Sequence, residues 1–169
     1  SKVNISVVAD PPEKRLVMES ILAELGEEVI IARSGEEALL QVLRHDFAVI
    51  LLDVNMPSLD GYETAALIRK RRRSAHTPII FITGHGDVPT AVATVKRGAF
   101  DFVEKPFSNN GLVDRVEEAL ATSARAIQAR RGNDQLKRAL AELTEREREV
   151  MRLVVDGRPN KLIADELGI

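Results

Sequence analysis

The chain has 169 residues, 44% of them hydrophobic, so it can form one domain of ordinary size or one domain with a small appendage. Its 24 basic and 26 acidic side chains leave a net charge of -2, which gives no global indication of nucleic-acid or anionic-membrane binding. The absence of cysteine excludes disulfides, zinc-finger spacing and thiol chemistry. Because no apolar run reaches the roughly 18 residues of a membrane span and the N-terminal stretch lacks a signal-peptide layout, we expect a cytoplasmic protein.

Short apolar runs alternate with amphipathic helical patterns between residues 3 and 121. The runs predict strands over 3–8, 29–32, 47–52, 78–82 and 100–104. The helical patterns predict helices over 14–25, 34–45, 60–68 and 87–97, and a fifth from about residue 108. This alternation favours an α/β fold, with a doubly wound five-stranded parallel sheet of order 2-1-3-4-5 and right-handed crossovers.

Local signals mark several of the expected helix ends. Pro11 and Pro12 precede the first helix, whose first turn tolerates proline, and Gly26 is placed to end it. Ser34 with Glu37 three residues later predicts a capping box. Asp60 can cap the third helix. The fourth helix carries the small residues Ala91, Ala93 and Thr94 and ends at Gly98, so we expect it to be weakly held.

The composition changes after about residue 121. Residues 123–135 are polar and rich in Ala and Arg, which indicates a helical linker, and Gly132-Asn133 predicts a break in its helix. Leu136, Leu140 and Leu143 then form a short apolar seam, which could serve a dimer or pack inside a monomer. Thr144 and Glu147 predict a capping box, followed by helices near 145–156 and 160–167.

Four polar residues end four of the predicted strands: Asp10, Asp53, Thr83 and Lys105. In a parallel sheet of this order the switch point lies between the first and third strands, so Asp10 and Asp53 should meet there. Two carboxylates at one site repel unless a cation lies between them, and hard oxygen ligands favour Mg²⁺. A carboxylate, a metal, a lysine and a hydroxyl together suit phosphoryl transfer to or from an aspartate.

At these residues the chain resembles the receiver domain of bacterial response regulators over residues 1 to about 122. The resemblance is carried by Asp53 in LLDVNMPSLDG, Thr83 in FITGHGDVP and Lys105 in DFVEKPF. It implies a flavodoxin-like receiver in which Asp53 accepts a phosphoryl group from a sensor histidine kinase. It further implies that Asp10, Asp53 and the carbonyl of Asn55 hold Mg²⁺, that Thr83 and Lys105 contact the phosphoryl group, and that Phe102 is a switch aromatic.

One departure from that family pattern concerns the acid pair after the first strand. The family has two adjacent acids there, whereas this chain has Ala9 followed by Asp10. The missing acid removes one negative charge and one ligand that acts through water, so we expect weaker Mg²⁺ binding. The same departure keeps a second hypothesis open, in which the chain is a pseudo-receiver that acts as an interaction module without phosphate.

The C-terminal stretch LTEREREVMRLVVDGRPNKLIADELGI resembles the start of the LuxR-type helix-turn-helix of NarL/FixJ-type regulators, without the recognition helix that would enter the major groove. Residues 134–169 contain seven Lys and Arg against eight Asp and Glu, which is no phosphate-binding patch. We therefore expect DNA binding by a full-length regulator and not by this chain alone. The predicted divisions are 1–122 receiver, 123–142 helical linker and 143–169 partial helix-turn-helix.

Other features have simpler interpretations. The basic run 69–73 could contact nucleic acid or a partner, but a solvated helix end that complements the helix dipole is favoured. His45, His76 and His85 share no ligand spacing and are interpreted as surface residues. A phosphatase of the haloacid dehalogenase type would need a second Asp at position 55, where this chain has Asn55.

The sequence thus predicts a phosphorylation-switched response regulator of a two-component system. Such a protein is a phosphoacceptor that assists its own Mg²⁺-dependent phosphorylation and dephosphorylation, and it is not an enzyme in the ordinary sense. The expected partners are a sensor histidine kinase, DNA in the full-length regulator, and a second copy if the apolar seam forms a homodimer; no membrane partner is expected.

Overall fold

A computed structural model of the chain describes residues 1–84, 89, 92–93 and 101–157. The chain divides into two compact units, Ser1–Arg125 and Ala126–Ile169. The first unit contains the sheet and the helices that cover it. The second contains the later turns of a long helix and the helix that follows it.

The first unit is built on a five-stranded parallel sheet with the order β2-β1-β3-β4-β5, as the sequence predicts. Its strands are β1 (Asn4–Val8), β2 (Glu28–Ala32), β3 (Val49–Asp53), β4 (Ile79–Thr83) and β5 (Asp101–Glu104). Every residue of β3 and β4 is buried, which explains why these strands are continuous apolar runs and do not alternate in polarity. The parallel register brings the carboxyl ends of all five strands to one edge of the sheet.

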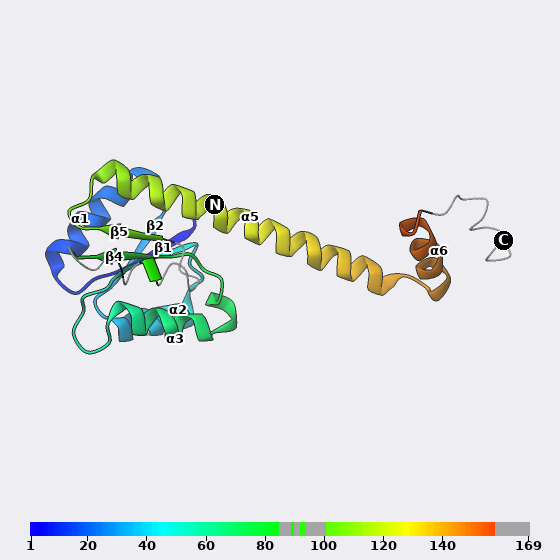
Figure 1. The fold of residues 1–169 in the computed structure, drawn as a ribbon, viewed down its shortest axis with the longest axis horizontal. Coiled ribbons are helices and arrows are strands. Elements are labelled where there is room, and N and C mark those ends of the chain that lie inside the picture. Colours follow the sequence, from blue (N-terminus) through cyan, green and yellow to red (C-terminus); the bar gives the residue numbers. More distant parts are fainter. Residues whose placement is uncertain (85–88, 90–91, 94–100, 158–169) are drawn as a thin grey trace. The chain divides into compact units, whose positions relative to one another are not determined.

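Helices cover both faces of this sheet. They are α1 (Pro12–Leu22), η1 (Ala23–Leu25), α2 (Gly35–Arg44), α3 (Gly61–Lys70), η2 (Arg72–Ser74) and the first turns of α5 (Asn109–Glu142). Figure 1 shows the sheet between α1 and α5 on one side and α2 and α3 on the other. This is the doubly wound arrangement that the alternating pattern predicts.

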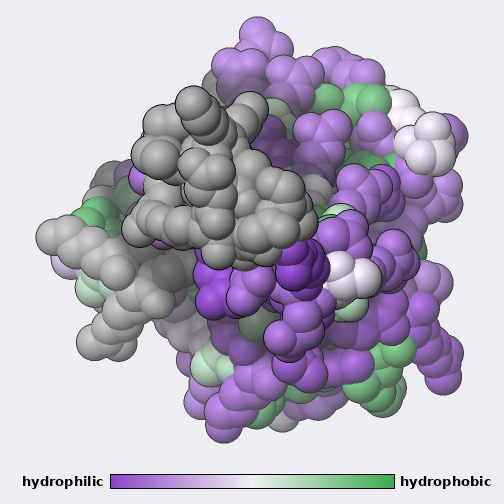
Figure 2. All heavy atoms as spheres, turned by 90° about the vertical axis from the view of Figure 1, so that its right-hand side faces the viewer, coloured by the Kyte–Doolittle hydropathy of each residue, from purple (hydrophilic) through white to green (hydrophobic). Residues whose placement is uncertain are grey.

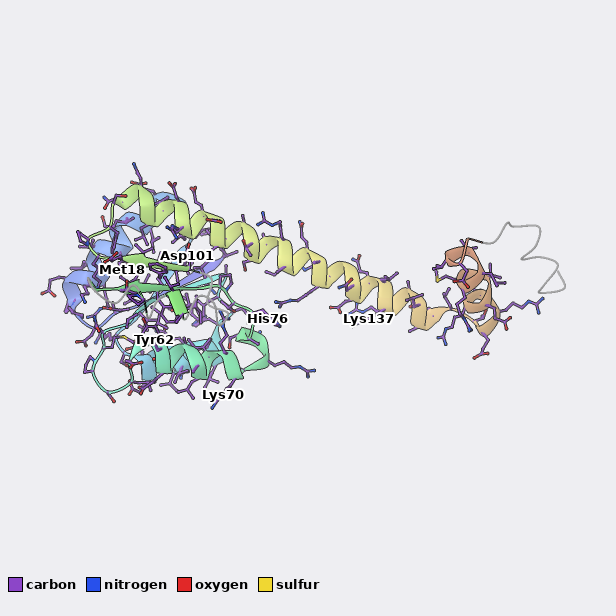
Figure 3. All side chains as sticks on the ribbon, in the orientation of Figure 1. Met18, Tyr62, Lys70, His76, Asp101 and Lys137 are labelled. Atoms are coloured by element: carbon purple, nitrogen blue, oxygen red, sulfur yellow. The ribbon has the colours of Figure 1, made fainter. Side chains whose placement is uncertain are left out.

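Two hydrophobic clusters fill the space between the sheet and its helices. One joins the sheet to α1 and α5 through residues such as Met18, Leu112 and Val116. The other joins the opposite face to α2 and α3 through residues such as Ala38 and Ile68. In Figure 3 the Met18 side chain reaches the sheet from one side and Tyr62 reaches it from the other. The two-sided burial fixes the position of β3 and hence of its last residue, Asp53.

The predicted start and stop signals operate as expected at most helix ends. Asp60 and Glu63 form both halves of a capping box at α3. Gly26 ends the turn after α1 with a positive φ of 68°. At α2 the Ser34 hydroxyl accepts from the Glu37 N–H, but the box is incomplete because the Glu37 carboxylate accepts from the N–H of Arg33 instead of that of Ser34.

The basic run 69–73 does not continue α3, which ends at Lys70. Arg69 donates to the backbone carbonyls of Ser74 and Ala75, and Arg71 donates to that of Val42. Arg73 forms an exposed ion pair with Asp46. These three arginines bind backbone carbonyls and a carboxylate of their own domain. The run is therefore structural, but Arg69 and Arg71 are half-buried and do not form the solvated helix end that the sequence predicts.

Part of the sequence prediction lies outside the described residues. This holds for most of the helix expected over 87–97, including Ala91, Thr94 and its Gly98 end, and for His85. It also holds for the helix expected over 160–167. The other two histidines, His45 and His76, lie within the described residues and are both exposed, as the sequence predicts for surface residues.

The predicted helix break at Gly132-Asn133 is wrong. Helix α5 runs without interruption from Asn109 to Glu142. Gly132 is exposed, and a Cβ added there would meet nothing within 4 Å, so no close contact demands a glycine. One glycine costs a helix only about 1 kcal/mol relative to alanine. The Ala, Arg and Gln residues around it favour the helix by more than that in sum.

The second unit contains the end of α5 and helix α6 (Glu145–Val155). Thr144 and Glu147 form the predicted capping box at the start of α6. A groove of about 550 Å³ lies between the two helices, lined by Leu140, Met151 and Val155 among others. Leu143 lines a second groove with Val150 and Val154. In Figure 2 hydrophilic side chains cover most of the described surface that faces the viewer, and hydrophobic ones form small separate groups.

Candidate functional site

The candidate site lies at the carboxyl edge of the sheet and is centred on Asp53. Asp53 is the last residue of β3, and its side chain is 1% exposed. The buried strand continues for one more hydrogen bond, from the Val54 N–H to the Ile82 carbonyl. The carboxylate therefore lies on a backbone that is held from both sides, which is what a reacting group needs in order to keep its geometry.

Gly61 allows the chain to close tightly behind Asp53. Its N–H donates to the Val54 carbonyl at 3.0 Å. A Cβ at position 61 would lie 2.4 Å from the Asp53 carbonyl oxygen and 2.8 Å from the Val54 Cα. Only glycine permits this approach of the α3 start to the end of β3. The Asp60-Gly61 pair thus both caps α3 and supports the site.

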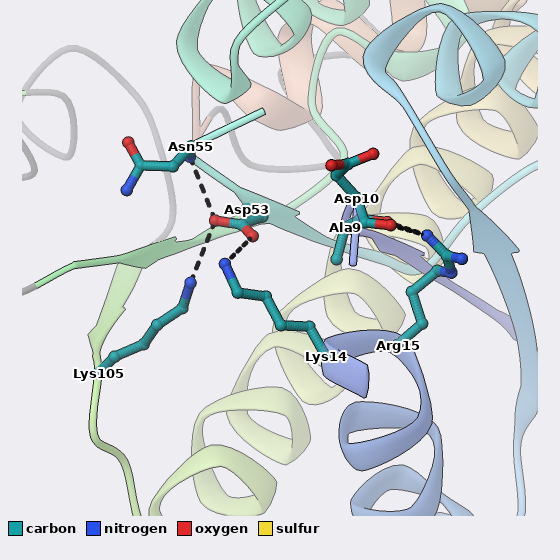
Figure 4. Close-up of polar contacts among 7 residues, drawn as sticks. All are labelled: Ala9, Asp10, Lys14, Arg15, Asp53, Asn55 and Lys105. Atoms are coloured by element: carbon teal, nitrogen blue, oxygen red, sulfur yellow. Dashed lines mark hydrogen bonds and ion pairs between the residues drawn. The ribbon is translucent and has the colours of Figure 1, made fainter. Parts of the chain in front are cut away.

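Two lysines bind the Asp53 carboxylate, one at each oxygen. Lys14 Nζ lies 3.0 Å from Oδ2, and Lys105 Nζ lies 3.3 Å from Oδ1. The N–H of Asn55 also donates to Oδ1, at 3.2 Å. Figure 4 shows the two lysine side chains reaching the carboxylate from α1 and from the segment after β5. A carboxylate this deeply buried requires such partners, because leaving it unpaired would be costly.

The two lysines differ in how firmly they hold a proton. Burial lowers the pKa of Lys105, and the neighbouring Lys14 lowers it further. The pKa of Lys14 is raised, first because a deprotonated Lys105 amine can accept from the Lys14 ammonium, and also by Asp53, against the opposing effect of its own burial. Burial is the largest cause for Lys105, which has 27% of its side chain exposed against 36% for Lys14. Lys14 is therefore the more persistent cation beside Asp53.

Asp10 lies beside the site but is arranged differently. It follows β1, which is the sheet neighbour of β3, and it is exposed. Arg15 holds the turn between β1 and α1, because its Nη1 donates to the backbone carbonyls of both Ala9 and Asp10. In Figure 4 the Asp10 carboxylate points away from the Asp53 carboxylate, and none of the drawn contacts reaches it. Ala9, which departs from the family pattern, is completely buried.

Thr83 and Phe102 complete the set of predicted site residues. Thr83 ends β4 and is completely buried, and its carbonyl accepts from the Lys105 N–H at 2.9 Å. Its Oγ1 makes no hydrogen bond with any group in the described part of the chain. Phe102 pairs with Phe81 in the sheet register and packs, half-buried, against the α2–α3 side of the core. An unpartnered buried hydroxyl beside the site has hydrogen-bonding capacity left for an incoming group.

A pocket of about 250 Å³ opens beside Asp53 on the side of α1. Lys14, Asp53 and Lys105 line it together with Glu13 and apolar side chains such as Val17, Met18 and Phe107. The two ammonium groups make its polar end attractive to an anion, and the apolar side chains form the rest of its wall. The pocket is large enough for a phosphoryl group next to the carboxylate.

Sequence reasoning missed Lys14 as a site residue. The helical pattern places Lys14 only at the start of a helix, because 39 residues separate it from Asp53 and no local pattern marks their contact. One signal is available: a lysine in the first turn of a helix that starts at the carboxyl edge can reach the neighbouring strand end. Gly61 was also missed, although its place directly after the Asp60 cap suggests close packing.

A five-stranded parallel sheet of order 2-1-3-4-5, with a buried aspartate, a lysine and a threonine at its carboxyl edge, defines a receiver-type domain. The family model described as "Response regulator receiver domain" matches residues 5–117, and the model described as "Bacterial regulatory proteins, luxR family" matches residues 141–169. The chain therefore belongs to the response regulator family of two-component signalling, with a receiver followed by a LuxR-family segment.

Similar proteins support the same assignment. Nodulation protein W of Bradyrhizobium diazoefficiens is 36% identical over all of this chain and 74% of its own length. The transcriptional regulatory protein FixJ of the same organism is 35% identical over all of this chain and 82% of its own length. Among solved structures, the response regulator StyR has a TM-score of 0.80 at 35% identity, and the match covers all of this chain and 84% of that one.

Receiver domains generally use Mg²⁺ for phosphorylation, so the donors of this site can be tested for that ion. Asp10, Asp53 and the Asn55 carbonyl offer the oxygen atoms that a hard cation prefers. However, both Asp53 oxygens already have hydrogen-bond donors, and no group of three acidic, histidine or cysteine side chains among the described residues could hold a metal ion. The donor chemistry fits Mg²⁺ only if Lys14 leaves Oδ2.

No helix in the described part of the chain is long and apolar enough to cross a membrane. Helix α5 has the length, with 34 residues, but charged side chains occur throughout it.

Proposed function

We propose that this response regulator accepts a phosphoryl group on Asp53 from a sensor histidine kinase. The observation that carries the proposal is the burial of Asp53 at the carboxyl edge with two lysine ammonium groups at its oxygens. Among the described residues, Asp53 is the only carboxylate that is buried. A buried carboxylate with fixed cations beside it is suited to a reaction that brings a second anion to the same place.

The reaction would be an in-line displacement at phosphorus. One Asp53 oxygen attacks, the O–P bond forms as the N–P bond to the kinase imidazole breaks, and the imidazole leaves with the electron pair and takes up a proton. Lys105 neutralises charge that accumulates on the phosphoryl oxygens, and the Thr83 hydroxyl donates a hydrogen bond to one of them. Asp10, Asp53 and the Asn55 carbonyl would hold Mg²⁺, which would supply further positive charge at the reacting group.

The switch would connect the phosphoryl group to the sheet surface around β4 and β5. Movement of Thr83 toward the phosphoryl group would leave space that Phe102 can enter, because the two residues lie on adjacent strands and Phe102 is only half-buried. We further propose the divisions 1–122 receiver, 123–142 linker and 143–169 LuxR-type part. In this scheme the cytoplasmic regulator controls transcription through its LuxR-type part.

The acceptor can be tested by intact-mass measurement after incubation with a small phosphodonor and Mg²⁺. We expect one added phosphoryl group on the wild type and none on Asp53→Asn. Asp114→Asn is the matched control, since Asp114 is an exposed carboxylate of α5. Equal labelling of the Asp53 and Asp114 variants would contradict the assignment of the acceptor.

A pseudo-receiver is the second candidate, and two observations favour it. Ala9 is buried where the family has an acid, and Lys14 occupies Oδ2 of Asp53. In that case the mass would not change with any phosphodonor. Ala9→Asp discriminates further, because an additional carboxylate at this edge strengthens the field for Mg²⁺. Tighter Mg²⁺ binding and faster labelling of Ala9→Asp would support a receiver, whereas no labelling of either protein would support the pseudo-receiver.

A further inference from the structure

The Lys14 ammonium occupies the place at Asp53 that a metal ion would need. Its Nζ lies 3.0 Å from Oδ2, which is the Asp53 oxygen that neither Lys105 nor the Asn55 N–H binds. Lys14 comes from the first turn of α1, shortly after the turn that carries Asp10. It therefore enters from the side on which the second proposed metal ligand lies (Figure 4).

The charges of the site are already balanced without a metal. Asp10, Glu13 and Asp53 are the carboxylates of this edge, and Lys14, Arg15 and Lys105 are its cations. Adding Mg²⁺ to this arrangement would place a double positive charge next to the two lysine ammonium groups, and like charges at such distances repel by several times the thermal energy. Removing Lys14 from Oδ2 would relieve the larger part of that repulsion and free an oxygen ligand at the same time.

The surroundings of Lys14 permit this displacement. Its side chain is 36% exposed, and the pocket of about 250 Å³ beside it is lined by Val17, Met18 and Phe107. The lysine stem can rotate into this space without disturbing the buried core. Arg15, in contrast, is tied to the Ala9 and Asp10 carbonyls and keeps the turn in place.

We propose that Lys14 is a built-in counter-ion of Asp53 that competes directly with Mg²⁺ and sets the metal affinity of this receiver. This inference shares with the proposed function only the Asp53 carboxylate, which is the site in both. In the resting protein Lys14 neutralises Asp53, and Mg²⁺ binds only by displacing the ammonium from Oδ2. Phosphorylation therefore needs a higher Mg²⁺ concentration than it would without Lys14.

The test is a titration of the full chain with Mg²⁺. Calorimetry and the amide NMR signal of Asn55 both report the binding. Lys14→Met removes the charge and keeps the length, and we expect it to lower the Mg²⁺ dissociation constant by roughly tenfold or more after allowance for solvent screening. Lys14→Arg keeps the charge and should stay close to the wild type. Lys70→Met is the matched control, because Lys70 is an exposed lysine at the end of α3 (Figure 3) and changes the net charge equally.

A double variant locates the effect. Adding Asp53→Asn to Lys14→Met should abolish the gain in affinity, because the freed oxygen is then no longer a carboxylate. Equal Mg²⁺ affinity in the wild type, Lys14→Met and Lys70→Met would overturn the inference. An equal gain in Lys14→Met and Lys70→Met would also overturn it, since net charge alone would then explain the effect.

The outcomes separate this inference from the proposed function. If Lys14→Met binds Mg²⁺ more tightly while no phosphodonor labels Asp53, the counter-ion role stands and the phosphoacceptor role fails. If Asp53 is labelled but the wild type, Lys14→Met and Lys70→Met bind Mg²⁺ equally well, the phosphoacceptor role stands and the counter-ion role fails. Where both stand, the Mg²⁺ concentration at half-maximal labelling should fall in Lys14→Met by about the same factor as the dissociation constant.

Discussion

The two units of this chain are stabilised in different ways. In the first, the central strands β3 and β4 are buried throughout, between two hydrophobic clusters. In the second, α6 has no buried residue, and Met151, Val154 and Val155 are exposed by 41%, 53% and 79%. The first unit depends on burial of apolar surface, whereas residues 126–157 of the second depend on a capping box and on contacts along two open grooves.

This difference explains where the chain can perform chemistry. A carboxylate with 1% exposure can be held beside two lysines only where a rigid backbone surrounds it, and β3 supplies that backbone. The helices of the second unit offer exposed apolar side chains instead, which are suited to packing contacts. Substitutions in the two units should therefore differ in their cost.

Truncation of the buried sheet should cost the most. Ile80→Ala removes a side chain with 0% exposure from the centre of β4, and such substitutions cost about 2–5 kcal/mol of the free energy of unfolding. Urea denaturation followed by circular dichroism measures the change. Val155→Ala in α6 is the counterpart, and we expect less than about 0.5 kcal/mol from it because that side chain is largely exposed. Similar costs for both variants would refute the comparison.

Gly61→Ala tests the tight closure behind Asp53. The new methyl group would lie 2.4 Å from the Asp53 carbonyl oxygen, so the backbone must shift. Overpacking of this kind costs about 1–3 kcal/mol, and displacement of Asp53 should also slow its phosphorylation. Denaturant unfolding and intact-mass labelling measure the two effects. A variant as stable and as readily labelled as the wild type would show that the close approach is not required.

Thr144→Ala tests whether the second unit depends on its local cap. The Thr144 hydroxyl accepts from the Glu147 N–H, and the Glu147 carboxylate accepts from the Thr144 N–H. Loss of such a cap costs about 1 kcal/mol. We expect faster hydrogen exchange in residues 145–150 and no change in the exchange of β3 and β4. If exchange stayed unchanged in α6, its stability would have to come from another source.

Gly132→Ala should have the smallest effect, and it should be stabilising. A Cβ at this exposed helical position meets nothing within 4 Å, and alanine favours a helix over glycine by about 1 kcal/mol. Increased helical content and slower hydrogen exchange in residues 126–140 would be the result. A loss of helix would mean that position 132 adopts a non-helical conformation in solution, in line with the break that the Gly-Asn pair predicts.

Several elements could be predicted from residues alone because their causes are local. The strand order follows from alternating strands and helices, and the cap at Asp60 and the capping box at Thr144 follow from residues near each helix start. The meeting of Asp53 with Lys105 also follows, because both residues lie at strand ends of one parallel sheet. The error at Gly132 arose where local signals were opposed, since helix formers on both sides outweighed one glycine.

Residue patterns were sufficient for the family, the sheet and the aspartate at its carboxyl edge, because apolar periodicity and strand-end residues act over short distances along the chain. The identity of the cations beside Asp53 depended instead on how the helices pack against the sheet. Lys14 lies 39 residues before Asp53, and its side chain reaches Oδ2 only because α1 packs against the sheet beside the end of β3. The same packing leaves the Asp10 carboxylate exposed. No local pattern encodes such contacts, because they join elements that only the folded sheet brings together.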